Sequence, residues 1–376
     1  MKKIVIIGPA FPLRGGLATY NERLCKAFTE ENHNACIYTF SLQYPSFLFP
    51  GTSQYSDEAP PEKLKILVKI NSINPFNWIQ IGLELKNKKP DIIVVRYWLP
   101  FIGPCLGTIL RLVKKNKHTK IVCIADNIIP HEKRPGDNLF TRYFIKPIDA
   151  FVTMSEKVLS DLDLFATHEK KKKFIPHPLY DNFGEIISRE EAIEKLNLQK
   201  DNNYMLFFGF IRKYKGLDLL LEALSKITNP NLKLIIAGEF YEDSNPYLDL
   251  IEQFNIQDKI ILKTNFITDS EVKYYFCASA VVIQPYKSAT QSGVTPLAYH
   301  FEIPMIVTNV GGLTGMVPNG KVGLIAEPNA ESVAEKINSY FDQNKEKEFK
   351  ENLKVEKKKY SWNVMTKAIL ELAETK

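Results

Sequence analysis

Short apolar segments alternate with helix-length amphipathic stretches along almost the whole chain. In the first half the apolar segments are rich in Ile and Val and do not alternate with polar residues, which is typical of parallel strands covered on both faces. The predicted strands are Ile4–Ile7, Ala35–Phe40, Asp91–Arg96, Lys120–Ala125 and Ala150–Met154. The predicted helices are Gly16–Glu30, Phe76–Lys88, Ile102–Lys115, Asn138–Lys146 and Ser155–Ala166. This repetition predicts a doubly wound α/β sheet.

The same rhythm restarts after residue 203. The predicted strands of the second half are Tyr204–Gly209, Leu232–Gly238, Lys259–Lys263, Ala280–Gln284 and Met305–Thr308. The predicted helices are Leu217–Thr228, Asn245–Phe254, Asp269–Ser279, Gln291–Phe301 and Ala330–Gln343, with Asp269 as the N-cap of its helix. The segment His177–Asn203, which holds a short helix at Arg189–Leu196, is interpreted as a hinge. We therefore expect two Rossmann-like domains, 1–178 and 179–360, that face a central cleft.

Charge is distributed unevenly between the two halves. The 376 residues are 45% hydrophobic and 24% charged, which excludes a disordered or fibrous chain. The formal charge is 49 − 43 = +6, too mild for a polybasic nucleic-acid binder. Residues 1–180 carry 26 − 16 = +10, and residues 181–376 carry 23 − 27 = −4. This asymmetry favours an anionic partner for the first half, such as a lipid headgroup surface or a phosphorylated substrate. The alternative is that these are ordinary solvated lysines.

The cysteines and the longest apolar stretch bear on localisation. Five cysteines without a CxxC or a His/Cys ligand spacing predict reduced thiols in a cytosolic protein. The apolar run near Met1 is too short for a signal peptide. Residues Tyr97–Leu110 are uncharged but interrupted by Pro100 and Pro104, so we expect a strand end and a buried helix. The expected localisation is cytoplasmic, with peripheral contact at the inner face of the membrane.

Ligands of doubly wound sheets bind beyond the carboxyl ends of the strands, and unusual residues follow two strands of the first half. Gly15 and Gly16 open a helix, where backbone N–H groups suit a phosphate or a sugar hydroxyl, although a purely structural turn is the alternative. Asp126 and His131 lie in a polar loop after the strand Lys120–Ala125. A carboxylate or a neutral imidazole there can accept a hydrogen bond from an attacking hydroxyl, so both are catalytic candidates.

Two loops of the second half are suited to anions. Arg212 and Lys215 precede a glycine and an amphipathic helix, and together they can hold a diphosphate with fixed positive charge. The alternative is a basic loop that only caps the sheet. Gln291, Ser292 and Gly293 stand at a predicted helix start, which is a second anion-binding geometry. No Asp-x-Asp that could hold a metal follows a strand, and the loop with Gly15 and Gly16 does not match the GxGxxG of dinucleotide-cofactor sites. We therefore expect neither a metal nor a cofactor.

Taken together, these motifs resemble those of the retaining glycosyltransferases of family four, which have the GT-B fold. Arg212–Ala223 is similar to the segment KG-x-D-x-L-x-x-A, Gly15-Gly16 to the first glycine loop, and Pro285–Gly312 to the donor region. The resemblance implies that Arg212 and Lys215 hold the diphosphate of a nucleotide-sugar, without a metal. It implies that Gly15-Gly16 approach donor and acceptor, and that a closing helix within 361–376 packs back on the first domain. Saccharide or lipid-linked acceptors are expected.

The chain departs from this family at four positions. Phe210 stands where the family has an arginine, and Ala289 and Leu297 stand where it has two glutamates. Asp126 occupies the place of a histidine. Two alternatives therefore remain open beside a transferase, namely an inactive scaffold that binds sugar nucleotides and a sugar-nucleotide epimerase on the same two-domain plan.

Overall fold

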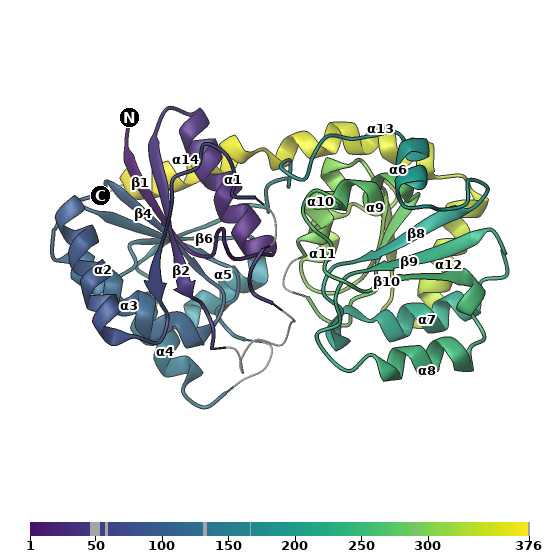
Figure 1. The fold of residues 1–376 in the computed structure, drawn as a ribbon, viewed down its shortest axis with the longest axis horizontal. Helices are drawn as coiled ribbons and strands as arrows, with labels where there is room; N and C mark the ends of the chain where they lie inside the picture. Colours follow the sequence, from purple (N-terminus) through teal and green to yellow (C-terminus); the bar gives the residue numbers. More distant parts are fainter. Residues whose placement is uncertain (46–52, 57–58, 131–133, 166, 290–291, 375–376) are drawn as a thin grey trace. The chain divides into compact units, whose positions relative to one another are not determined.

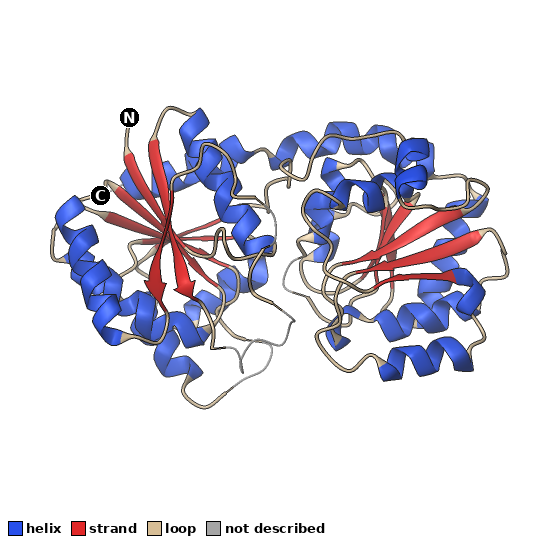
Figure 2. Ribbon diagram, viewed as in Figure 1, coloured by secondary structure: helices blue, strands red, loops and turns tan. Residues whose placement is uncertain are grey.

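The computed structural model describes the chain except residues 46–52, 57–58, 131–133, 166, 290–291 and 375–376. It divides into two compact units, one of Met1–Pro178 with Ser361–Lys376 and one of Leu179–Tyr360. Each unit contains a parallel sheet with helices on both of its faces (Figures 1 and 2). The prediction of two doubly wound α/β domains is confirmed, whereas the acceptor and donor roles of the units stay predictions.

The sheet of the first unit has seven parallel strands in the order β3-β2-β1-β4-β5-β6-β7. The strand order reverses between β1 and β4, which pair directly from Ile4↔Ile92 to Ile7↔Val95. All six residues of β4 are buried, as expected for a strand covered on both faces. The strands are β1 (Lys3–Ile7), β2 (Asn34–Leu42), β3 (Ile66–Asn71), β4 (Ile92–Tyr97), β5 (Lys120–Ala125), β6 (Ala150–Thr153) and β7 (Lys171–Phe174).

Two sets of helices cover this sheet. One core, which includes Leu85, Leu106 and Phe144, lies under α2 (Pro75–Lys88), α3 (Gly103–Lys114), α4 (Asp137–Ile145) and α5 (Glu156–Asp163). The short 3-10 helix η2 (Pro100–Ile102) leads into α3. Helix α1 (Gly16–Glu30) packs against β2 and against the closing helix α14 (Trp362–Glu374), which also contacts β5 and β6. The closing helix thus packs within the first unit, where Thr366 donates a hydrogen bond to Glu31 at 2.6 Å.

The sheet of the second unit has six parallel strands in the order β10-β9-β8-β11-β12-β13, and it reverses between β8 and β11. The strands are β8 (Asn203–Phe208), β9 (Leu232–Ala237), β10 (Ile260–Lys263), β11 (Val281–Gln284), β12 (Met305–Thr308) and β13 (Gly323–Ala326). The helices are α6 (Arg189–Lys195), α7 (Leu217–Ser225), α8 (Asn245–Gln253), α9 (Val272–Ala278), α10 (Val294–His300), α11 (Leu313–Met316), α12 (Ala330–Asp342) and α13 (Glu346–Glu356); the 3-10 helices are η3 (Lys213–Lys215), η4 (Gln257–Lys259) and η5 (Lys357–Tyr360).

Three strands, β3, β7 and β13, lie outside the predicted set. Strand β3 contains a lysine and ends on asparagine, and β13 has four residues that begin with glycine. Strand β7 is Lys171–Phe174, which consists of three lysines and a phenylalanine. It is an edge strand paired only with β6, so its lysines reach solvent or acids such as Glu371, which accepts from Lys173 at 2.9 Å. Because β3 was overlooked, the strand before Asp126 is the fifth and not the fourth.

Two further expectations were wrong in detail. Helix α9 begins at Val272 with Glu271 as its N-cap, and not at Asp269, because Thr268 and Glu271 hydrogen-bond to each other in the turn before it. The hinge expected at 177–203 is largely part of the second unit, since its helix α6 packs against α9. No helix in the described part of the chain is long and apolar enough to cross a membrane. The five cysteines are all unpaired.

Candidate functional site

The loops of interest in the second unit follow the two strands at which the sheet order reverses. Residues 209–216 follow β8 and residues 285–293 follow β11, and these strands are neighbours in the sheet. Crevices at such a reversal, beyond the carboxyl ends of the strands, are where doubly wound sheets bind ligands. Arg212, Lys215, Ser292 and Gly293 therefore lie on two adjacent loops at the expected edge.

Lys215 is the most unusual ionisable group of this edge because its side chain is buried. Burial, with a smaller contribution from the charge of Arg212, lowers the pKa of Lys215 to about 7. Its ammonium lies 5.8 Å from the centre of the Tyr286 ring. A β-carbon at Gly209 would lie 3.1 Å from the Lys215 Nζ. No described carboxylate forms an ion pair with Lys215, so this loop provides a cation without a protein counter-charge.

Two glycines allow the loops to approach closely. Gly216 has φ of 70°, and a β-carbon there would lie 2.0 Å from the carbonyl oxygen of Pro285. Gly311 has φ of 51°, and a β-carbon there would lie 1.6 Å from the carbonyl oxygen of Ala289. Both positions combine a left-handed backbone with a close backbone contact, so only glycine fits. The loop after β11 is thereby held against the loop after β8 and the turn after β12.

The loop after β11 carries hydroxyl groups towards the start of α10. The hydroxyls of Tyr286 and Ser292 lie 3.2 Å apart, and the Ser292 Oγ accepts from the backbone N–H of Val294 at 3.1 Å. Gly293 is the N-cap of α10, and the helix starts at Val294, later than the sequence predicted. The buried Gln284 at the end of β11 accepts from Thr295 at 3.1 Å, while its amide nitrogen has no partner among the described residues.

Gly15 and Gly16 of the first unit form the predicted helix start. Gly15 is the N-cap of α1 with φ of 100°, and Gly16 is the first residue of the helix and is exposed. Gly8, directly after β1, is also constrained, since a β-carbon there would lie 2.5 Å from Asn21 Nδ2 and 3.1 Å from Arg96 Cβ. The turn between β1 and α1 is thus packed closely on β4, its neighbour at the reversal of the sheet.

Asp126 is buried and forms a bidentate ion pair with Arg96 of β4. The Arg96 Nε and Nη2 donate to the two carboxylate oxygens at 2.5 and 2.6 Å. The guanidinium carbon lies 3.8 Å from the centre of the Tyr20 ring. A contact between Asp126 and an acceptor hydroxyl stays a prediction, and it would have to use lone pairs that Arg96 leaves available.

His177 completes this cluster. Its ring meets the ring of Tyr20 edge to face at 5.1 Å, and Tyr20 also meets Trp362 of the closing helix at 4.9 Å. Burial, with a smaller effect of the charge of Arg96, lowers the pKa of His177 to about 3. The imidazole is therefore neutral at physiological pH, and its Nδ1 lies 2.6 Å from the carbonyl oxygen of Pro178.

Sequence reasoning missed Arg96, His177 and Tyr286. A signal existed for Arg96, which is the only charged residue in the strand IIVVRY. Nothing marked His177 or Tyr286, because their importance comes from partners distant in the sequence. The predicted residues His131 and Gln291 lie outside the described residues.

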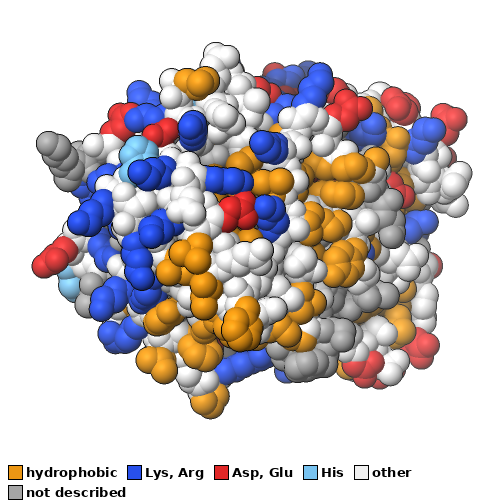
Figure 3. Space-filling model, turned by 60° about the vertical axis from the view of Figure 1, so that its left-hand side comes forward, with side chains coloured by type: hydrophobic (Ala, Val, Ile, Leu, Met, Phe, Trp, Pro, Cys, Tyr) orange, Lys and Arg blue, Asp and Glu red, His pale blue; other side chains and the backbone are white. Residues whose placement is uncertain are grey.

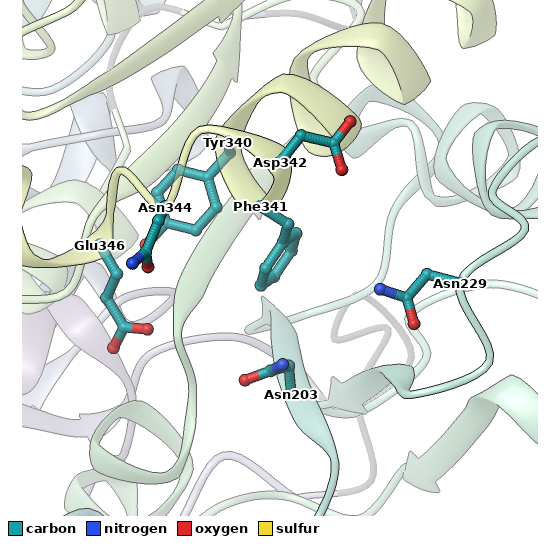
Figure 4. A pocket seen from close by; sticks show the side chains of 7 residues that line it. All are labelled: Asn203, Asn229, Tyr340, Phe341, Asp342, Asn344 and Glu346. Carbon is teal, nitrogen blue, oxygen red and sulfur yellow. The ribbon is translucent and has the colours of Figure 1, made fainter.

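A separate pocket of the second unit lies at the amino end of β8, where Asn203 begins the strand (Figure 4). Two of its polar side chains pair with Arg189: Asn203 accepts from Arg189 at 3.3 Å, and Glu346 lies 3.6 Å from Arg189. This is the sheet edge opposite to the loops with Arg212 and Lys215. The lining residues are Asn203, Asn229, Tyr340, Phe341, Asp342, Asn344 and Glu346.

Metal ligands do not gather in the part of the chain that the structure describes, where no group of three or more His, Cys, Asp or Glu side chains lies together. That the reaction needs no metal stays a prediction.

Comparisons with known proteins agree with this geometry. Residues 188–359 match the family model of the glycosyl transferases group 1. The chain is 27% identical over 347 residues to a D-inositol 3-phosphate glycosyltransferase of Thermobifida fusca, covering 83% of this chain and 77% of that protein. An uncharacterized glycosyltransferase of Methanocaldococcus jannaschii is 24% identical over 355 residues, 88% of this chain and 87% of its own.

Solved structures with the same fold include two at a TM-score of 0.75. One is sucrose-phosphate synthase from Thermosynechococcus elongatus, 14% identical, covering 99% of this chain and 98% of that one. The other is HepE of Anabaena in complex with UDP-glucose, 13% identical, with 98% of each chain covered. These structures show the same GT-B fold with two Rossmann-like domains. The family match covers residues 188–359, which lie in the second unit.

Proposed function

We propose that the chain is a retaining hexosyltransferase that uses a nucleotide-diphosphate sugar, without a metal, and transfers the sugar to a saccharide or lipid-linked acceptor. The observation that carries this proposal is the buried Lys215 at the reversal of the second sheet, with a pKa of about 7 and no described counter-ion. A buried cation of this kind is stabilised by an anion that enters the site. A diphosphate supplies that charge.

The proposed donor site joins Lys215 and Arg212 with Ser292 and Gly293. Arg212 is exposed and lies with its guanidinium carbon 4.8 Å from the centre of the Tyr241 ring, so its planar fork can turn towards a phosphate. In the reaction, the bond between the sugar C1 and the diphosphate oxygen breaks, and its electron pair stays on the diphosphate. The two cations stabilise that developing charge. Gln291 is proposed for this site as the neighbour of Ser292.

The acceptor side is proposed to lie in the first unit. The acceptor oxygen attacks C1 on the face from which the diphosphate leaves, which gives retention, and its proton passes to a leaving phosphate oxygen. Gly15 and Gly16 are proposed to approach the substrates through their backbone, and Asp126 and His131 to orient the acceptor hydroxyl. A relative that acts on a glycolipid supports this acceptor class: a GDP-mannose:glycolipid 4-beta-D-mannosyltransferase of Xanthomonas campestris is 30% identical over 104 residues, 27% of this chain.

A second candidate is a scaffold that binds sugar nucleotides without turning them over. It is favoured by Ala289 and Leu297, which provide no carboxylate where the resembled family has two glutamates. An epimerase on the same fold is a third candidate. An assay that measures both released nucleoside diphosphate and isomerised sugar nucleotide distinguishes all three.

The decisive variant is Arg212→Ala with Lys215→Ala, compared with Lys213→Ala. Lys213 is exposed in the same short helix η3, so its loss changes the local charge without emptying the proposed site. We expect the double variant to lose donor binding by roughly 100-fold or more, because two charge-assisted hydrogen bonds of about 1.5–3 kcal/mol each disappear. Equal donor affinity in the double variant and the control would contradict the diphosphate site.

A further inference from the structure

The pocket at the amino end of β8, which we call the Asn203 pocket, has a cavity of about 180 Å³. This is far more than the roughly 10–15 Å³ that a single water molecule needs. It is less than the about 300–1,000 Å³ of pockets for drug-sized ligands. The walls come from the start of β8, from the loop between α7 and β9, and from the turn between α12 and α13. The cavity therefore has room for one ring of a small molecule.

One phenylalanine ring and three asparagine side chains line this cavity. Phe341 is half-buried in the last turn of α12, and Figure 4 shows its ring between Tyr340, Asn203 and Asn229. The amide of Asn229 points towards this ring. Asn344, in the turn before α13, is exposed and provides the third amide. An apolar ring surface is thus combined with several polar groups, as in ligand pockets generally.

The three amides have hydrogen-bonding capacity that the protein does not use. The Oδ1 of Asn203 accepts from Arg189, and the Oδ1 of Asn229 accepts from the backbone N–H of Asn231 at 3.0 Å. Among the described residues, the Nδ2 groups of Asn203 and Asn229 have no acceptor, and the side chain of Asn344 has no partner. Each amide can both donate and accept, so together they can pair with groups that do the same.

The charges near the pocket largely compensate each other. Glu346 accepts from Lys350 at 2.7 Å and lies 3.6 Å from Arg189. The other carboxylate, Asp342, is exposed and points away from Phe341 (Figure 4). Lys and Arg side chains gather elsewhere, as on the face of the molecule in Figure 3, and residues 181–376 carry a net charge of −4. The pocket therefore suits a neutral ligand better than an anion.

We propose that the Asn203 pocket binds a neutral saccharide residue. The C–H face of a pyranose ring is apolar and can pack against the ring of Phe341, while its hydroxyls both donate to and accept from amides. A purely apolar ligand would bury the amides of Asn203 and Asn229 without partners, which costs free energy. A saccharide satisfies the ring and the amides at once.

The purpose of this site rests on the proposed function. Strand β8 begins at the pocket with Asn203 and ends at Phe208, before the loop that carries Lys215. Its six residues span about 20 Å, so the pocket lies outside the proposed donor site. One residue of a long acceptor held at the pocket raises the local concentration of the rest of that acceptor. We therefore expect the acceptor to be an oligosaccharide or polysaccharide and not a single sugar.

The test is saturation-transfer difference NMR of the full chain, titrated separately with glucose, galactose, mannose, N-acetylglucosamine and maltose. The variant is Phe341→Leu with Asn344→Gly, which removes the ring and one amide. Leucine keeps most of the apolar volume, and glycine adopts the left-handed φ of 49° at position 344 without strain. We expect at least one of these sugars to bind the wild type, and to bind the variant roughly tenfold more weakly.

The matched control is Phe254→Leu with Asn255→Gly at the end of α8. Phe254 is also half-buried, and Asn255 is also exposed, with a left-handed φ of 51°. Neither residue lines the Asn203 pocket. The control should therefore bind the sugar as tightly as the wild type.

Four results would overturn the inference. They are no binding of any of these sugars to the wild type, equal binding to the wild type and the pocket variant, an equal loss in the pocket variant and the control, and variant-sensitive binding of spermidine but of no sugar. Hydrolysis of nucleotide-sugars by the wild type is measured separately. Absence of that hydrolysis, with variant-sensitive sugar binding intact, would contradict the proposed transferase but not the saccharide pocket.

Discussion

Replacing Lys215 with methionine should stabilise the folded protein while it abolishes donor binding. Methionine keeps the unbranched shape of the side chain and removes its charge. In the native second unit the pKa of Lys215 falls from 10.5 to about 7 because the ammonium is buried. The unfolded chain has no such burial, so the lysine carries a penalty in the folded state that methionine does not.

The size of this penalty follows from the shift. One pKa unit corresponds to about 1.36 kcal/mol, so the folded state loses on the order of 4 kcal/mol near pH 7. Between pH 7 and 10.5 the unfolded lysine holds its proton and the folded one does not, so the stability of the wild type rises with pH. By pH 9 the penalty should shrink by about 2 kcal/mol, whereas Lys215→Met should lack this gain.

The assay can separate the two units. The three tryptophans, Trp78, Trp98 and Trp362, all lie in the first unit, so tryptophan fluorescence follows that unit alone. Far-UV circular dichroism follows both units, and urea unfolding recorded by both signals isolates the second transition. Lys213→Met, at the exposed neighbouring position, is the matched control.

The expected result is a second-unit transition that moves to higher urea in Lys215→Met, by more at pH 7 than at pH 9, with no nucleotide binding. Equal free energies of unfolding for Lys215→Met and Lys213→Met at both pH 7 and pH 9 would refute this prediction. It is equally refuted if Lys215→Met still binds the donor, because the buried charge would then serve no ligand.

Further predictions concern the packing around both candidate sites. Asp126→Asn removes the negative charge that pairs with the buried Arg96, so tryptophan-detected urea unfolding should show a loss of about 3–5 kcal/mol, and a loss below about 1 kcal/mol would contradict the buried pair. Because the pKa of His177 is lowered to about 3, stability should fall as the pH decreases below 6.5, by about 2 kcal/mol between pH 7 and 5. His177→Gln should lose that component, and an unchanged pH dependence in the variant would rule it out. Gly216→Ala drives a β-carbon into the Pro285 carbonyl oxygen, so it should lower the second-unit midpoint in circular dichroism and weaken donor binding, whereas wild-type values of both would show that the loop adapts.

The sequence was sufficient to predict both sheets, because most strands are uninterrupted apolar runs between amphipathic helices. It was insufficient for β7, where the strand Lys171–Phe174 gains its ladder from β6 although its side chains are mostly lysines. The same limit applied to β13, where Gly323 begins the strand and lies so close to β12 that a β-carbon there would be 2.1 Å from the Met305 carbonyl oxygen. Such elements depend on tertiary neighbours and not on their own pattern.

The candidate site was predictable where its residues follow strands in sequence, as Arg212, Lys215 and Gly15 do. The electrostatics of the candidate site could not be predicted from the sequence. The sequence shows Asp126 as a polar residue after a strand, but only the folded chain brings Arg96 to both of its carboxylate oxygens. Likewise, burial changes Lys215 from an ordinary surface cation into a group with a pKa of about 7.

The central claim is tested most directly by incubating the purified chain with UDP- and GDP-sugars, with and without a lipid extract, and measuring free nucleoside diphosphate by ion-exchange chromatography. We predict that one donor releases its diphosphate, that the lipid extract accelerates the release, and that Lys215→Ala with Arg212→Ala abolishes it while Lys213→Ala does not. Tight donor binding with no released diphosphate, or an isomerised sugar nucleotide in place of a transferred sugar, would contradict the assignment as a glycosyltransferase.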